Sequence, residues 1–163
     1  MRTVSSDPAH LDQSDLAILQ ILQQENMTPQ RAIGKAVHLS AAAVQRRIKR
    51  MQENGIIISN VAVVDPTRAG YLITIVVDVE LQSERSDLYD AAKKRFEAAP
   101  EVQQCYDVTG ETDFVLIILV RSMPEYRALT DRLFFKNKNI KSFRTLVVMD
   151  RVKVGLHVPL TPF

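Results

Sequence analysis

Six basic side chains occupy a stretch of the chain that contains no acidic residue. The stretch runs from Asn26 to Gln52, between Glu25 and Glu53. Its basic residues are Arg31, Lys35, Arg46, Arg47, Lys49 and Arg50. Because the formal net charge of the whole chain is only +2, this local excess of positive charge predicts a surface that faces phosphate groups. The alternative is that these basic side chains form a solvent-exposed helix face that binds no partner.

The positive and negative charges are unequal in the N-terminal part of the chain and balanced in the C-terminal part. Residues 1–60 hold seven Lys/Arg and five Asp/Glu, whereas residues 61–163 hold fourteen of each. All of the net positive charge therefore lies in the N-terminal part, and we expect the two parts to have different partners. An apolar fraction of 46% is enough for real hydrophobic cores. No apolar run approaches the roughly 20 residues that span a bilayer and no secretory signal is apparent, so we expect a cytoplasmic protein without membrane partners.

A first helix is predicted from Leu11 to Leu22. Apolar residues recur there at helical spacing, Asp12 is a plausible N-cap, and Asp15 follows three residues later, close to a capping box. A second, short helix is predicted over 28–37, because this segment begins with a capping threonine followed by a proline.

The basic run forms the third predicted helix, which begins after the N-cap Ser40. Val44, Ile48 and Met51 recur at i, i+4 and i+7, so one face of this helix is expected to be buried while the others carry the basic side chains. The small Gly34 and the short connection between the second and third helices are typical of a helix-turn-helix.

A strand pair is predicted after the third helix. Asn54 and Gly55 supply a helix stop, and residues 56–64 are rich in β-branched side chains. The sequence therefore predicts a winged helix-turn-helix DNA-binding domain over residues 1–60, followed by a linker over 61–69.

In a helix-turn-helix, the N-terminal end of the recognition helix enters the major groove of double-stranded DNA, and flanking basic residues bind phosphates. Here that end contains three alanines, which offer methyl contacts to thymine but no hydrogen bonds to base edges. Only Ser40, Gln45 and Arg46 could read base edges directly, so we expect degenerate specificity that depends partly on DNA shape. The predicted DNA-binding residues are Ser40, Ala41, Ala42, Gln45, Arg46, Arg47, Lys49 and Arg50.

Residues 70–163 are predicted to form a second domain with the element order βαββαβ. Strands are expected over 71–81, 102–109, 113–120 and 140–149, and helices over 86–98 and 124–135. This order is that of a ferredoxin-like sandwich, in which two helices cover one face of an antiparallel sheet, so the fold class is α+β. We expect the other sheet face to pack on a second copy of the chain, which would pair two helix-turn-helix units on a two-fold operator.

Taken in order, these features resemble the leucine-responsive regulatory protein/AsnC family of transcription regulators, from Leu11 to about Lys153. The residues that carry the resemblance are Leu11, Asp12, Asp15, Ile18, Leu19, Leu39, Ser40, Val44, Arg47, Ile48, Gly55, Ile56, Ile57, Val102, Cys105, Val108, Thr109, Gly110, Asp113, Phe114 and Thr145 to Met149. Three positions depart from the family pattern. His38 stands where glycine is usual, Met51 where leucine is usual, and Thr112 where an aromatic residue is common.

The resemblance implies a homodimer that assembles into an octamer, a tetramer of dimers. It also implies a small molecule, usually a free amino acid, held where the second domains of neighbouring dimers meet, and it places loop 109–113 at that site. We expect this amino acid to be leucine or methionine-like. Loop N–H groups would bind the carboxylate, and Asp113 would accept from the ammonium group. The alternative is that Gly110 and Asp113 belong to an ordinary hairpin turn that binds no ligand. The predicted effector-binding residues are Thr109, Gly110, Glu111, Thr112, Asp113, Phe114, Leu133, Phe134, Thr145 and Val147.

No catalytic or metal-binding pattern accompanies these features. His10, His38 and His157 lack metal-ligand spacing, and the single cysteine, Cys105, is expected to be a small buried residue. No catalytic Ser/His/Asp set or nucleotide fingerprint occurs, so we predict no metal, no cofactor and no enzyme. Two alternatives remain open. One is a sirohaem decarboxylase-type enzyme on the same architecture, against which the intact basic helix argues, and the other is a DNA-architectural protein without an effector.

Overall fold

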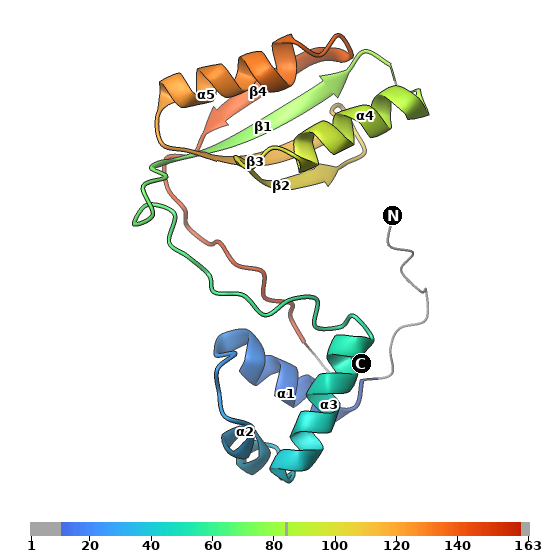
Figure 1. Cartoon of the computed structure of the whole chain (residues 1–163), viewed down its shortest axis with the longest axis vertical. Coiled ribbons are helices and arrows are strands. Elements are labelled where there is room, and N and C mark those ends of the chain that lie inside the picture. Colours follow the sequence, from blue (N-terminus) through green and yellow to red (C-terminus); the bar gives the residue numbers. More distant parts are fainter. Residues whose placement is uncertain (1–10, 84, 161–163) are drawn as a thin grey trace. The chain divides into compact units, whose positions relative to one another are not determined.

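The structure of the protein is a computed structural model that describes residues 11–83 and 85–160 (Figure 1). The described residues form two compact units. The first contains the residues up to Ala62 together with those from Val154 onward, and the second runs from Val63 to Lys153. The chain therefore passes twice between the two units.

Three helices build the first unit: α1 (Gln13–Gln24), α2 (Gln30–Ala36) and α3 (Ala41–Glu53). The capping box that the sequence predicts is present on α1. The Asp12 carboxylate accepts from the N–H of Asp15, and the Asp15 carboxylate accepts from the N–H of Asp12. On α3, the Ser40 hydroxyl oxygen accepts from the N–H of Ala43 at 3.1 Å. These bonds satisfy N–H groups that have no partner inside their helices.

The turn between α2 and α3 brings backbone segments into close contact. The N–H of Leu39 donates to the carbonyl of Gly34 at 2.9 Å, and a Cβ added at Gly34 would lie only 2.5 Å from the carbonyl oxygen of Leu39. In the part of the chain that the structure describes, His38 is the only non-glycine residue with positive φ, at 56°. Histidine adopts this left-handed conformation more readily than most residues, so the turn forms without the usual glycine.

The three helices enclose a small apolar core. Ile18 and Ile33 contribute from α1 and α2, and Val44 and Met51 from the predicted stripe of α3 are fully buried. Ile48, the third member of the stripe, is partly buried and packs against this core. The apolar period of α3 therefore decides which of its faces is left for the basic side chains.

Residues 154–160 pack against α1 within the first unit. The Gln23 side chain donates to the carbonyl of Val158 at 3.1 Å and accepts from its N–H at 2.7 Å. The Gln20 side chain donates to the carbonyl of Leu160 at 2.9 Å, and Leu160 packs against the apolar core. This tail was predicted to belong to the second domain, and its described residues pack with the first unit. Its extended backbone finds its hydrogen-bonding partners on α1.

The predicted wing is not formed by the described residues, because residues 56–64 contain no strand. The N–H groups of Ile56 and Ile57 donate to the carbonyl of Met51 and so close the end of α3, while Val63 is 96% exposed. The β-branched residues favour an extended backbone, but a strand also needs a neighbour for its N–H and C=O groups. The α+β class with an N-terminal helix-turn-helix is confirmed, whereas the strand pair over 56–64 is not found.

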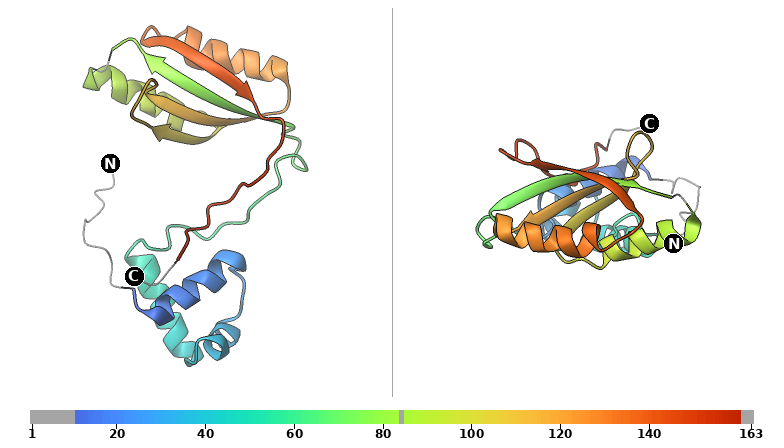
Figure 2. Two further views of the ribbon diagram at one scale, coloured as in Figure 1. Left: turned by 180° about the vertical axis from the view of Figure 1, so that it is seen from behind. Right: turned by 90° about the horizontal axis from the view of Figure 1, so that it is seen from above.

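The second unit is a four-stranded sheet with helices on one face (Figure 2). Its elements are β1 (Ile73–Leu81), α4 (Ser86–Glu97), β2 (Val102–Asp107), β3 (Phe114–Val120), α5 (Met123–Thr130) with its π-helical continuation η1 (Asp131–Phe135), and β4 (Ile140–Val147). The strand order is β2-β3-β1-β4, and every neighbouring pair is antiparallel. This arrangement is the predicted ferredoxin-like βαββαβ sandwich.

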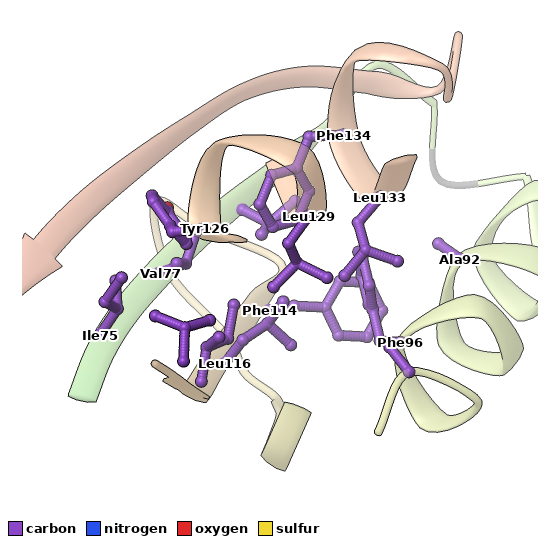
Figure 3. Close-up of a cluster of buried hydrophobic side chains, with 14 of the residues drawn as sticks. Ile75, Val77, Ala92, Phe96, Phe114, Leu116, Tyr126, Leu129, Leu133 and Phe134 are labelled. Carbon is purple, nitrogen blue, oxygen red and sulfur yellow. The ribbon is translucent and has the colours of Figure 1, made fainter. Parts of the chain in front are cut away.

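Apolar side chains from the sheet and both helices fill the space between the two layers (Figure 3). Alternate residues of β1 from Ile75 to Val79 face the helices and are fully buried, as the two-residue period of a strand requires. Phe96 of α4 lies between Phe114 and Phe134, with ring centroids 5.4 Å and 6.1 Å away and both pairs edge-on. The core therefore fixes α4 and α5 against the sheet.

The opposite sheet face remains partly open. Tyr106 on β2 and Leu146 on β4 are 49% and 47% exposed. Towards β4 this face is charged, because Arg144 pairs with Asp78 across the two strands at 2.5 Å. An apolar patch bordered by ion pairs is suited to a protein interface.

We expect the substitution Gly34→Ala to destabilise the first unit by about 1–3 kcal/mol, because the new methyl group must displace backbone rather than a flexible side chain. Urea unfolding followed by far-UV circular dichroism measures this change. Gly155→Ala is the matched control, since a Cβ there approaches only a side-chain atom, Nδ1 of His157 at 3.3 Å, rather than backbone. Unchanged or increased stability of Gly34→Ala would contradict the close approach of the two backbone segments.

Candidate nucleic-acid interface and ligand-binding loop

The N-terminal end of α3, which is predicted to enter the DNA groove, is open to solvent. Ser40, Ala41 and Ala42 are exposed, and so is Gln45 one turn further on. The Ser40 oxygen already accepts from the N–H of Ala43. The exposed methyl groups and the amide of Gln45 are therefore the main means by which this end can contact bases directly.

Two of the predicted basic residues are free to reach an external anion. Arg46 is exposed and has no hydrogen-bond or ion-pair partner among residues 11–83 and 85–160. The Lys49 side chain is 74% exposed and lies 3.7 Å from Glu53, one turn away. Such an exposed pair contributes little, so it does not prevent Lys49 from meeting a phosphate group.

Arg47 and Arg50 are instead bound to the N-terminus of α1. One Arg47 nitrogen, Nη1, lies 2.6 Å from Asp12 Oδ2 and 2.8 Å from Asp15 Oδ1. The Arg50 Nη2 lies 2.5 Å from Asp15 Oδ2. The Asp15 side chain is only 1% exposed, so its charge depends on these two arginines. Both arginines, which were predicted to bind DNA, therefore also tie α1 to α3.

Asp12 and Asp15 are functional neighbours of the interface that sequence reasoning missed. Their spacing indicated a local role, the capping box, and that role is real. Their second role is tertiary, because Arg47 lies 35 residues beyond Asp12 and 32 beyond Asp15. The only available signal was an acidic pair at the start of one helix together with an excess of basic residues on another.

The ion pair shifts the titration of both of its members. The hydrogen bond from Arg47, followed by that from the Asp15 N–H, lowers the pKa of Asp12 below its ordinary value. Hydrogen bonds to Asp12 and Asp15 raise the pKa of Arg47. Both shifts favour the charged forms, so the Asp12–Arg47 pair is fully ionised at neutral pH.

A hollow of about 330 Å³ lies on the same side of α3. It is lined by Leu39, Ala43, Arg46, Arg47 and Arg50. Guanidinium groups present planar, permanently charged sets of donors that match the oxygens of a phosphate group. The arrangement can therefore bind an anion of this kind, with Leu39 and Ala43 beside it.

The second predicted site is the hairpin between β2 and β3. The Asp113 carboxylate oxygen Oδ2 accepts from the N–H of Leu81 at 2.7 Å, and its own N–H donates to the carbonyl of Val79 at 2.9 Å. The Thr112 hydroxyl donates to the same carbonyl at 2.7 Å. Gly110 has φ 134°, a conformation that favours glycine. The hairpin role considered from the sequence is thus present, while Asp113 Oδ1 has no partner among the described residues.

The other predicted effector contacts do not surround this loop within one chain. Phe114, Leu133 and Phe134 are buried in the core between sheet and helices (Figure 3), so a ligand could reach them only by displacing that core. Thr145 and Val147 lie on β4, which β1 separates from β3. A hollow of about 400 Å³ in this unit contains Phe134 but none of the other predicted contacts. It is lined by Phe134, Phe135, Asn137, Lys138, Ile140, Lys141, Ser142 and Phe143.

The described ranges contain neither a metal-binding cluster nor a membrane-spanning helix. No group of three or more His, Cys, Asp or Glu residues is placed there to hold a metal ion. None of the helices in those ranges has the length and apolar character needed to cross a membrane. Cys105, predicted to be buried, is exposed because it lies on the edge strand β2.

Comparison with known proteins matches both units. The AsnC-type helix-turn-helix domain matches residues 11–52, and the Lrp/AsnC ligand binding domain matches residues 74–157. An HTH-type transcriptional regulator of Sinorhizobium fredii is 41% identical over 150 residues, which are 92% of this chain and 89% of that protein. The leucine-responsive regulatory protein of Haemophilus influenzae is 29% identical over 143 residues, 88% of this chain and 85% of that protein.

Solved structures agree with this assignment. An AsnC family transcriptional regulator from Agrobacterium tumefaciens has a TM-score of 0.86 and 28% identity, covering 92% of this chain and 97% of that chain. A transcriptional regulator of Neisseria meningitidis in complex with L-Met shares the fold, with a TM-score of 0.87 and 23% identity over 93% of this chain and 97% of that chain. Both domains match in sequence and in the predicted order, and the chain belongs to the Lrp/AsnC family of DNA-binding transcription regulators.

Proposed function

We propose that this regulator binds double-stranded DNA through α3 with degenerate specificity, and that an amino acid, leucine or methionine-like, controls its DNA binding or its assembly. The main support for the DNA-binding part of this proposal is the exposed basic face of α3. There Arg46 has no partner among the residues that the structure describes, and it borders a hollow whose other charged walls are Arg47 and Arg50.

The chemistry of α3 supports strong binding to the backbone and weak reading of bases. Cationic side chains attract phosphates of any sequence and release counterions as they bind. The exposed Ala41 and Ala42 offer only methyl groups to a groove, and Gln45 is one of few amide or hydroxyl side chains beside them. Selectivity then depends on how readily the DNA adopts the shape that paired helix-turn-helix units require.

The proposal that an amino acid acts as effector is supported by the match to the ligand-binding family domain and by the chemistry of loop 109–113. Asp113 Oδ2 is fixed by the N–H of Leu81, which leaves Oδ1 to accept from an ammonium group. Thr109, Gly110 and Glu111 are exposed beside it and carry backbone N–H groups for a carboxylate. The structural relative from Neisseria meningitidis is a complex with L-Met, which supports an apolar amino acid as the ligand class.

A complete effector site requires a second chain. Thr145 and Val147 lie on β4, two strands away from the loop of β3, so one chain cannot bring both groups around one small ligand. We therefore place the effector between neighbouring copies in an assembly, with a homodimer formed through the open sheet face as its unit. Tyr106 and Leu146 provide apolar area for that contact, and dimers would combine into the octamer.

We expect Arg46→Ala to weaken binding to specific and random duplexes alike, by about three- to tenfold at low salt, because Arg46 contacts phosphate. Fluorescence anisotropy from about 50 to 200 mM salt should also show the salt slope falling by about 0.9. Arg68→Ala is the matched control, since Arg68 is exposed and lies in the second unit. If Arg46→Ala leaves affinity and slope unchanged, α3 does not hold DNA as proposed.

Leucine or methionine should raise the melting temperature of the wild-type protein in a screen of the twenty amino acids. A ligand at about 100 times its Kd stabilises the folded state by about 2.7 kcal/mol. Asp113→Asn should abolish this shift, because the amide still accepts from Leu81 but carries no charge for the ammonium group. Asp107→Asn, on the same hairpin, is the control.

The screen has two contrary outcomes. A full thermal shift in Asp113→Asn would show that Asp113 does not bind the ammonium group. The absence of any shift across the twenty amino acids, with DNA binding intact, would instead favour an architectural protein without an effector.

A further inference from the structure

The ion network between α1 and α3 has one buried and one exposed half. The Asp15 side chain is 1% exposed, and each of its oxygens contacts an arginine, Arg47 at Oδ1 and Arg50 at Oδ2. The Asp12 side chain is 49% exposed and contacts Arg47 alone among the arginines. An exposed ion pair contributes little to the stability of the fold, whereas removing the partners of a buried carboxylate is strongly destabilising. The Asp12–Arg47 contact is therefore the half that another anion can replace.

Arg47 would stay in place if Asp12 released it. Its Nη1 contacts Asp15 Oδ1 at 2.8 Å as well as Asp12 Oδ2 at 2.6 Å, so the buried carboxylate continues to hold it. A guanidinium group has five N–H donors. The other Arg47 nitrogens, Nε and Nη2, have no partner among the residues that the structure describes. Arg47 can thus bind an incoming anion without losing its attachment to α1.

The place for such an anion is the hollow beside α3. Arg46, Arg47 and Arg50 line it together with two apolar side chains. Arg46 is unpaired, whereas Arg47 and Arg50 already share carboxylates with α1. A phosphate group at this position would meet Arg46 and Arg47, and Asp12 already occupies one of the Arg47 nitrogens.

Helix capping does not require the charge of Asp12. One of its oxygens, Oδ1, accepts from the N–H of Asp15 at 2.8 Å and caps α1, while Oδ2 contacts Arg47. Asparagine and serine cap helices about as well as aspartate. The favourable negative charge in the first turn is also supplied by Asp15. The second oxygen of Asp12 therefore has its main effect on Arg47.

We infer that the hollow lined by Arg46 and Arg47 binds a phosphate group of the DNA backbone, and that Asp12 competes with this phosphate for Arg47. The inference rests on the proposed DNA-binding function. In the free protein Asp12 holds Arg47, and on DNA the phosphate takes the place of Asp12 while Asp15 keeps the side chain in position. Asp12 thereby lowers the affinity for DNA of any sequence.

The test is the variant Asp12→Asn, which retains a capping oxygen and loses the charge. Its affinity for specific and random duplexes, measured by fluorescence anisotropy, should rise about three- to tenfold at about 50 mM salt. The gain should shrink towards about 200 mM salt. The matched control is Glu25→Gln at the other end of α1, where the acid accepts from the N–H of Met27 and has no contact with Arg47. This control should leave DNA affinity unchanged within about twofold, because screening weakens the effect of a distant exposed charge.

A second measurement separates competition from a general change of charge. In an Arg47→Gln background, Asp12→Asn should give no further gain, because the group for which phosphate and Asp12 compete is absent. A gain that persists in this background overturns the inference, and so does unchanged or weaker DNA binding by Asp12→Asn. Circular dichroism checks that α1 is intact. If asparagine fails to cap it, Asp12→Ser is the second neutral cap, and loss of DNA binding by both variants also overturns the inference.

These outcomes distinguish the inference from the function on which it rests. A wild-type protein that binds no DNA, or one whose binding is insensitive to salt, refutes the proposed function itself. A wild-type protein that binds DNA and responds to Arg46→Ala, but is indifferent to Asp12→Asn, refutes only the competition.

Discussion

The buried carboxylate of Asp15 is the constraint on which the DNA-binding unit depends. A charge that is almost completely removed from water must be paired, and its partners, Arg47 and Arg50, both belong to α3. Apolar packing of Val44 and Met51 presses α3 against the core but is not directional. The ion contacts are directional, so they reinforce the orientation of α3 that its buried apolar stripe sets. Arg46 is left on the outside as a consequence.

In the second unit the corresponding constraint is the central position of β1. It pairs with both β3 and β4, so the hairpin before β3 and the polar residues of β4 stand on opposite sides of it. Asp113 belongs to this arrangement, because its carboxylate holds the N–H of Leu81 at the end of β1. A small effector that needs both sets of groups must use two chains. Effector binding and assembly are then linked, since a ligand shared between copies stabilises the contact between them.

Sequence reasoning succeeded where the determining interactions are local or periodic. It predicted the Ser40 cap, the buried stripe of α3 and the βαββαβ order, all of which depend on nearby residues or on spacing along one element. It failed where a residue depends on a distant partner. The β-branched segment 56–64 has no strand neighbour in the described chain, and Phe114 was assigned to a ligand although it completes the core. Residue type and period do not show which segments meet.

The basic stretch also depends on distant partners, and these partners reduce the positive charge that is available for DNA. The stretch itself contains no acidic residue, but in the folded unit Asp12 and Asp15, at the start of α1, form ion pairs with two of its arginines. The helix-turn-helix unit therefore offers fewer unpaired charges than the count suggests, and Arg46 is among those that remain unpaired within the described residues. Under the proposed function, a unit with few unpaired charges would bind DNA best as one of several linked units, since linked units bind with an effective concentration that a single unit lacks. Under the proposed function, a change in assembly changes DNA occupancy, and an effector held between chains would control DNA binding in this way.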